Sequence, residues 1–164
     1  MNENIKRDFI DLLDEHQNLI HKICRIYTKD VDSHNDLFQE ISIQLWRSFP
    51  NYKGDSKFST WAYRVALNTA ISLFRKTKRS IEVSDVDFSN YQFSSSDYND
   101  EEEMQLKKMY HYIHMLNDID KALIFMYLED KEYKEISDTL GITEVNVRVK
   151  LNRIKNKLKT QLNP

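Results

Sequence analysis

The stretch GDSKFSTWAYR (residues 54–64) places three aromatic residues within six positions, between a lysine and an arginine. Rings that stack on exposed bases, beside cations that follow a phosphate backbone, are what single-stranded nucleic acid requires of a protein. Considered alone, the stretch favours core packing for Phe58 and Trp61. If the same chain also carries a motif that binds duplex DNA, base stacking becomes the better interpretation of these rings. On a helix its polar side comprises Lys57, Thr60, Arg64, Asn68, Arg75 and Arg79, opposite an apolar side.

A second candidate is the carboxylate pair in DLFQE, where Asp36 and Glu40 lie four residues apart on one helical face. Such a pair could perform acid–base or metal chemistry. No histidine supports the pair at helical spacing, and no pocket signature follows it. Two interpretations therefore remain open: a solvated helix face, or a docking face for a partner protein.

The other reactive side chains indicate no catalytic or metal centre. His111 and His114 are three residues apart but have no further ligand cluster nearby, so we expect no metal and no cofactor. The single cysteine, Cys24, rules out an intramolecular disulfide and lies in an apolar run typical of a buried thiol. Because the sequence shows no nucleophile elbow, phosphate-binding glycine loop or catalytic triad, we expect no enzyme.

The most specific pattern is YKEISDTLGITEVNVRVKLNRIKNKL (residues 133–158). It predicts a short helix over 133–140, a left-handed turn at Gly141 and a helix capped by Thr143. Ser137 is a small residue at the position where the two predicted helices would cross, so it allows them to approach closely. This pattern is typical of a helix-turn-helix.

The last predicted helix has two distinct sides. Val147, Leu151, Ile154 and Leu158 form an apolar stripe at helical spacing. The major groove of DNA admits a helix, and arginine and asparagine there can bond to base edges. The alternative is a solvated basic helix of a helical hairpin. Pointing away from the stripe are Val145, Arg148, Val149, Asn152, Arg153 and Asn156.

These motifs require a helical scaffold, and the composition favours one. Only two glycines and two prolines occur, which leaves little turn chemistry for strands. Apolar periodicity predicts helices over 8–27, 34–49, 58–76, 104–116 and 120–130, in addition to the helix-turn-helix, with a loop at 51–56. We therefore expect an all-α fold with two small helical domains.

The charge distribution divides the chain into three parts. Residues 80–103 hold eight acids and no Lys or Arg, so all 24 basic residues lie outside against 26 − 8 = 18 acids. We expect an acidic flexible linker over 80–103 between domains 1–79 and 104–164. The acids either keep the linker extended or fold back over the cationic faces. Without a signal segment or a long apolar run, we expect a cytoplasmic protein with no membrane insertion.

Two segments together, HNDLFQEISIQLWRSFPNYKGDSKFSTWAYRVALNTAISLFRK (34–76) and 133–158, resemble regions 2 and 4 of the sigma-70 family. The absence of the larger members' additional domains is similar to the extracytoplasmic function (ECF) group. The resemblance implies a transcription initiation factor that binds core RNA polymerase, directs it to promoters and promotes DNA melting. It also implies three sets of site residues.

The first set would dock on the clamp helices of the largest polymerase subunit: Asp36, Leu37, Gln39, Glu40, Ile43 and Trp46. The second would open the −10 element and hold its single non-template strand: Lys57, Phe58, Ser59, Thr60, Trp61, Arg64 and Asn68. The third would read the −35 element of duplex promoter DNA in the major groove: Arg148, Val149, Asn152 and Arg153.

The chain departs from the family pattern at Val149 and Asn152, which are not the residues expected for a common −35 sequence. The resemblance further implies an anti-sigma factor as a partner. Two alternatives stay open on the residues. A stand-alone helix-turn-helix regulator would need a dimerisation surface, and a nucleic-acid enzyme would need a catalytic cluster.

Overall fold

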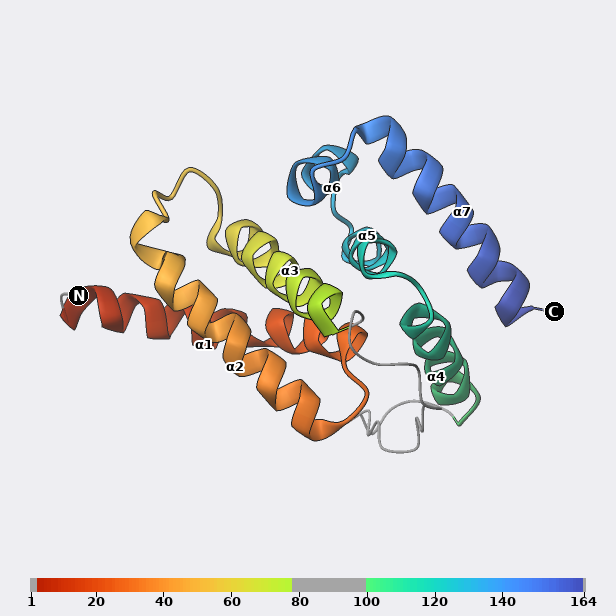
Figure 1. Cartoon of the computed structure of the whole chain (residues 1–164), viewed down its shortest axis with the longest axis horizontal. Coiled ribbons are helices and arrows are strands. Elements are labelled where there is room, and N and C mark those ends of the chain that lie inside the picture. The colour runs from red at the N-terminus through yellow and green to blue at the C-terminus, as the bar shows by residue number, and fades with distance from the viewer. Residues whose placement is uncertain (1–2, 78–99, 164) are drawn as a thin grey trace. The chain divides into compact units, whose positions relative to one another are not determined.

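The computed structural model describes residues 3–77 and 100–163. Among these residues only helices and connecting turns occur, which confirms the all-α prediction (Figure 1). The chain divides into two compact units, Met1–Ile81 and Glu82–Pro164. Most of the expected acidic linker, residues 80–99, lies outside the described part of the chain.

Residues 3–77 of the first unit form three long helices: α1 (Glu3–Tyr27), α2 (Val31–Ser48) and α3 (Phe58–Thr77), with a short 3₁₀ helix, η1 (Phe49–Asn51), after α2. Each long helix packs against the other two (Figure 1). Cys24 is fully buried, as the sequence predicts, and burial raises the pKa of its thiol to about 12. The core between the helices includes Phe9, Ile20, Ile23, Leu37, Ile41, Leu45, Ala66, Leu67 and Ala70.

Capping side chains determine where α2 begins. The Asp30 carboxylate accepts hydrogen bonds from the Ser33 backbone N–H at 2.8 Å and from the Ser33 hydroxyl at 2.7 Å. These bonds lower the pKa of Asp30, because they favour its charged form. The helix therefore starts at Val31, before the expected His34, and its last turn runs into η1 at Pro50.

The described part of the second unit, residues 100–163, forms four helices: α4 (Asp100–His114), α5 (Asp118–Leu128), α6 (Tyr133–Leu140) and α7 (Glu144–Leu162). The longest, α7, contacts each of the other three. Asn117 caps α5 by accepting the Asp120 N–H at 2.9 Å, so α5 begins two residues before the sequence prediction. The buried side chains include Ile113, Leu116, Leu123, Met126, Ile136, Val147, Leu151 and Ile154.

The structure corrects the end of the expected linker. Residues 100–103 belong to the first turn of α4 and not to a linker. Carboxylates are favourable at that end of a helix, because they complement the positive end of the helix dipole. Glu103 also pairs with Lys107 at 2.7 Å, one turn further along. The acids at 100–103, which suggested the end of a linker, are therefore also favourable at the start of a helix.

A histidine pair connects α1 to α2. His21 Nδ1 and His34 Nε2 are hydrogen-bonded at 2.9 Å, and the His21 ring stacks on Phe38 with centroids 4.4 Å apart. Desolvation lowers the pKa of both histidines, and the charge of Arg25 lowers both further. The folded unit thus favours the neutral form of the pair.

We expect the first unit to lose stability as the pH falls from about 7 to 5. The unfolded histidines bind protons near their ordinary pKa of about 6.5, while the folded pair binds them only at lower pH, so acid favours unfolding. His34→Gln keeps a hydrogen-bonding group but removes one titration, and should flatten the fall of Tm with pH. His16→Gln is the control for removal of a histidine elsewhere in the bundle. Equal pH dependence in His34→Gln and wild type would contradict this.

Candidate nucleic-acid and partner surfaces

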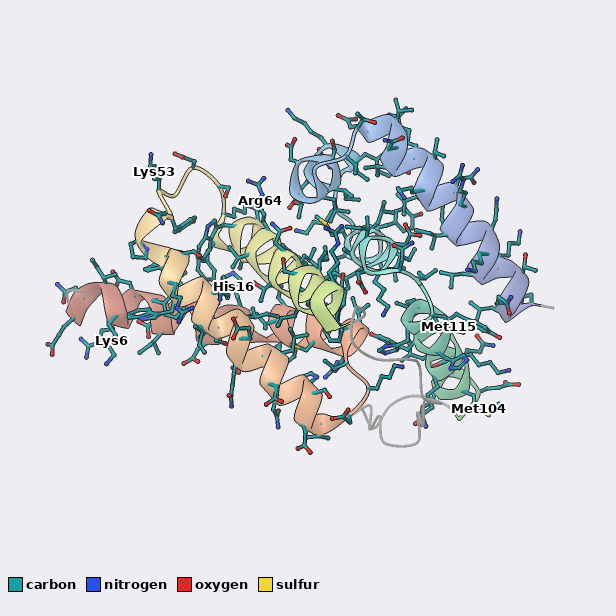
Figure 2. The ribbon with its side chains drawn as sticks, in the orientation of Figure 1. Lys6, His16, Lys53, Arg64, Met104 and Met115 are labelled. Carbon is teal, nitrogen blue, oxygen red and sulfur yellow. The ribbon has the colours of Figure 1, made fainter. Side chains whose placement is uncertain are left out.

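The first candidate surface lies along the outer side of α3 and on the loop before it. Figure 2 shows Arg64 on α3 and Lys53 on this loop, with both side chains directed away from the helices of the unit. The opposite side of α3, including Ala66 and Ala70, is fully buried. We define the α3 surface by the predicted residues that are exposed or half-buried on this outer side: Lys57, Ser59, Thr60, Trp61, Arg64 and Asn68.

Four aromatic rings support the start of the α3 surface. The Trp61 ring centroid lies 5.0 Å from Tyr52, 5.4 Å from Phe58 and 6.2 Å from Phe49. The Tyr52 hydroxyl donates a 2.7 Å hydrogen bond to the Ser56 carbonyl, which closes the loop. We call these four rings the aromatic cluster. It holds Trp61 in one orientation while leaving part of its surface open to solvent.

Phe58 requires a correction. The sequence suggested a ring that stacks on a base, but only 6% of Phe58 is exposed. Its ring faces α1, 5.1 Å from His16, because the first residue of α3 points into the bundle. Stacking on a base would require this ring to leave the core. In the structure the Phe58 ring packs against the ring of Trp61.

Tyr52 is a site residue that the sequence analysis missed. It was treated only as part of a loop, yet its half-buried ring forms one side of the aromatic cluster. The sequence signal for this role is an aromatic residue two positions before a glycine. Gly54 takes the left-handed conformation, with φ 76°. A tight turn of this kind returns the chain toward the helix and brings the two rings together.

The second candidate surface is the solvent side of α7. Gly141 adopts φ 67°, which confirms the predicted left-handed turn, and its N–H donates to the Ser137 carbonyl at 2.9 Å. The Ser137 hydroxyl donates to the Ile142 carbonyl at 2.5 Å, so this serine also closes the turn. Thr143 caps α7, as predicted, by accepting the Asn146 N–H at 3.2 Å.

The predicted base-reading residues all lie on one side of α7. We define the α7 face by these four exposed side chains: Arg148, Val149, Asn152 and Arg153. The guanidinium of Arg148 lies 5.6 Å from the centroid of the Tyr133 ring, at the start of α6. Tyr133 thereby positions Arg148, since a cation over a ring face is attracted to it.

Two lysines of α7 interact within the second unit. Lys150 Nζ lies 3.6 Å from an Asp120 carboxylate oxygen, and Lys155 Nζ lies 4.6 Å from the centroid of the Tyr127 ring. Both contacts join α7 to α5. They hold the helix against its support.

The third candidate surface lies on α2. Asp36 and Gln39 are exposed, and Ile43 is 43% exposed. The half-buried Glu40 accepts a 2.8 Å hydrogen bond from Gln44 Nε2. We define the α2 face by these residues and the half-buried Trp46: Asp36, Gln39, Glu40, Ile43 and Trp46.

An apolar groove extends the α2 face toward α1. Its volume is about 290 Å³. The Trp46 ring forms its floor together with Phe9, with ring centroids 5.0 Å apart. Sequence reasoning missed the contribution of α1, which only the packing of the two helices reveals. The groove is lined by Lys6, Phe9, Ile10, Ser42, Ile43 and Trp46.

Leu37 requires the second correction. The family resemblance placed it among the docking residues, but it is 3% exposed and faces the bundle core. Its spacing of four from Ile41 puts both side chains on the buried side of α2. Leu37 therefore holds α2 in place, and the candidate docking residues are those on the opposite side.

Within residues 3–77 and 100–163, no three His, Cys, Asp or Glu side chains gather closely enough to hold a metal ion. None of the helices in these ranges is long and apolar enough to cross a membrane. The three surfaces contain no nucleophile–base pair. Their exposed groups are suited to binding.

Comparison with known proteins accounts for both units. The family model for sigma-70 region 2 matches residues 12–80, and that for sigma-70 region 4 matches residues 106–158. The ECF RNA polymerase sigma factor SigM of Bacillus subtilis is 29% identical over 90% of this chain and 91% of its own. The RNA polymerase sigma-H factor of Pseudomonas aeruginosa is 26% identical over 97% of this chain and 88% of its own.

Solved structures share the fold. The sigma factor RpoE of Bartonella quintana, solved with the anti-sigma factor NepR, aligns with a TM-score of 0.72 over 98% of both chains, at 17% identity. CnrH, solved with the cytosolic domain of CnrY, aligns with a TM-score of 0.68 over 96% of this chain and 89% of its own, also at 17% identity. The two matched regions together span more than half of the sequence, in the order predicted. The chain therefore belongs to the sigma-70 family and is an ECF RNA polymerase sigma factor.

Proposed function

We propose that this sigma factor binds core RNA polymerase through the α2 face and directs it to promoters through the α3 surface and the α7 face. One observation carries the proposal. Arg148, Asn152 and Arg153 are exposed on a helix held by a helix-turn-helix, while a separate unit exposes cations beside a tryptophan. A protein that reads duplex DNA and also holds a single strand needs both surfaces.

The α7 face is suited to the −35 element in the major groove. The N-terminal part of a recognition helix contacts base edges in helix-turn-helix proteins. Arginine pairs well with guanine and asparagine with adenine. The cation–π contact with Tyr133 supports this role, because Arg148 loses less side-chain freedom on binding when it is already positioned.

The α3 surface is suited to the opened −10 element. Unstacking a base costs a few kcal/mol, and stacking on an aromatic side chain returns about 1–3 kcal/mol per base. The solvent-exposed part of Trp61 provides such a ring. Lys57, Arg64 and Asn68 would contact the backbone of the same single strand. Phe58 and Tyr52 support this surface by holding the tryptophan in place.

The α2 face is suited to a protein partner. Its carboxylates are poorly explained by catalysis, and the apolar groove beside them supplies the mixture of charge and buried apolar contact found in interfaces. We assign this face to the clamp helices of the largest polymerase subunit. The chain itself then needs no catalytic activity, since the polymerase performs the chemistry.

An anti-sigma factor is a further proposed partner. Of the two solved structures described above, one is a complex with the anti-sigma factor NepR, and the other is a complex with the cytosolic domain of CnrY. A regulator that covers either DNA-binding surface would keep this sigma factor from promoters. The place of action would be the cytoplasm, where core polymerase and promoter DNA are found.

The double variant Asp36→Ala, Glu40→Ala should bind core RNA polymerase at least tenfold more weakly, with helicity and Tm nearly unchanged. Both side chains lie outside the core, so their loss removes partner contacts without opening a cavity. Asp14→Ala, Glu15→Ala removes two exposed acids from α1 as a matched control. Binding can be measured by pull-down with core enzyme. Wild-type affinity in the α2 variant would reject the docking role, and a stand-alone regulator would not bind even as wild type.

Loss of the Trp61 ring should impair promoter opening while sparing the closed complex. Trp61→Ala risks loosening the aromatic cluster, so Trp61→Leu, which keeps apolar volume without a flat ring, is the second variant. Permanganate reactivity of unpaired thymines reports opening, and mobility shift reports the closed complex. Normal opening by a folded Trp61→Leu protein would contradict base stacking by this residue.

Arg153→Ala should weaken holoenzyme binding at the −35 element by about 1–3 kcal/mol if the side chain contacts a base edge. The loss of binding free energy should come from one base pair. Substituting this base pair should therefore weaken binding by the wild type but not by the variant. Lys157→Ala, which removes an exposed cation further along α7, is the control. A loss equal across all −35 sequences would indicate a phosphate contact instead.

A further inference from the structure

Two valines in the first turns of α7 have side chains largely in solvent. Val145 is 68% exposed and Val149 is 44% exposed. Residues four apart lie on the same face of a helix, so the four methyl groups form one small apolar patch. We call these two residues the valine patch.

The valine patch lies opposite the core. At about 100° per residue, Val149 falls about 40° from Val145, whereas the buried Val147, Leu151 and Ile154 fall roughly 180–240° away. Arg148 and Arg153 flank the patch, at about 60° on one side and about 80° on the other. Along the middle of the surface that would enter the groove, the first two turns are therefore apolar and the exposed Asn152 follows them, while the edges are cationic.

Folding does not account for these valines. A β-branched side chain loses rotamer freedom in a helix and has a lower helix propensity than Lys, Arg or Glu. Each exposed valine also gains little from burial in the folded unit. Single exposed apolar residues are common on protein surfaces, but two on the same outer side in the first turns of a recognition helix indicate a contact made with a bound ligand.

Base-pair chemistry in the major groove identifies that contact. Thymine alone presents a methyl group there, whereas the other bases are distinguished by their hydrogen-bonding groups. Valine offers no donor or acceptor, so against a guanine or cytosine edge it would leave polar groups without partners. A thymine methyl group is the complementary surface.

We propose that Val145 and Val149 read thymine in the −35 element through its C5-methyl group. The inference rests on the proposed function of α7 as the −35 reader and adds a sequence preference and a further specificity residue, Val145. Four residues of helix span about 6 Å, and stacked bases lie about 3.4 Å apart. The contacted thymines, on either strand, therefore lie within about two base-pair steps of each other.

The test uses holoenzyme assembled from the full chain and a bacterial core polymerase. Promoters are first selected from a library randomised over the −35 element, and each thymine of the enriched element is then replaced by deoxyuridine. This replacement removes only the methyl group. We expect binding to weaken about three- to fivefold at one or two positions, as for burial of one methyl group.

The valine variants assign each methyl contact. In Val145→Ala and Val149→Ala, the effect of deoxyuridine should disappear at one position each, because the contact is already lost. Alanine favours the helix, so both variants should keep their fold. Val31→Ala removes a valine that is 65% exposed in the other unit, and it should retain every deoxyuridine effect.

The outcomes separate the inference from the proposed function. If no −35 sequence is enriched, the reading of this element by α7 is wrong, and the thymine inference is rejected with it. If a sequence is enriched but lacks thymine, tolerates deoxyuridine throughout within about 1.5-fold, or shows the same deoxyuridine effects in both valine variants, only the thymine inference is rejected.

Discussion

Each functional helix in this protein is buried along one side only, and its rotation about its own axis decides which residues reach a ligand. In these small helical units α2, α3 and α7 each bury one stripe, so the opposite stripe faces outward. Caps and turns help to define the helix starts. Asp30 does so for α2, and Thr143 with the Gly141 turn does so for α7. The three candidate surfaces follow from these starts.

The two units support their exposed surfaces in different ways. In the second unit, α7 is held by α4, α5 and α6, and the cation–π contacts of Arg148 and Lys155 join it to α6 and α5. In the first unit, the aromatic cluster holds the start of α3. Trp61 is therefore both a packing residue and a candidate binding residue, and any substitution there must separate these two contributions.

The corrections at Phe58 and Leu37 follow from a conflict between two kinds of information. Leu37, Ile41 and Leu45 are spaced four apart and all lie on the buried side of α2, whereas the family resemblance assigns Leu37 to a partner. Phe58 was assigned to a base in the same way. In both cases the structure agrees with core packing, because a large apolar side chain on the inner side of a helix gains more from burial than from solvent exposure.

By itself, the sequence determined the helical class, the family and the helix-turn-helix, including the bounds 133–140, the turn at Gly141 and the buried stripe of α7. These features are encoded by caps, glycines and periodicity among neighbouring residues. Only the tertiary structure decided that Tyr52 supports Trp61, that His21 bonds to His34 and that α1 completes the apolar groove beside α2. These contacts join separate elements, so no local pattern contains them. They depend on which helix lies opposite and at what rotation.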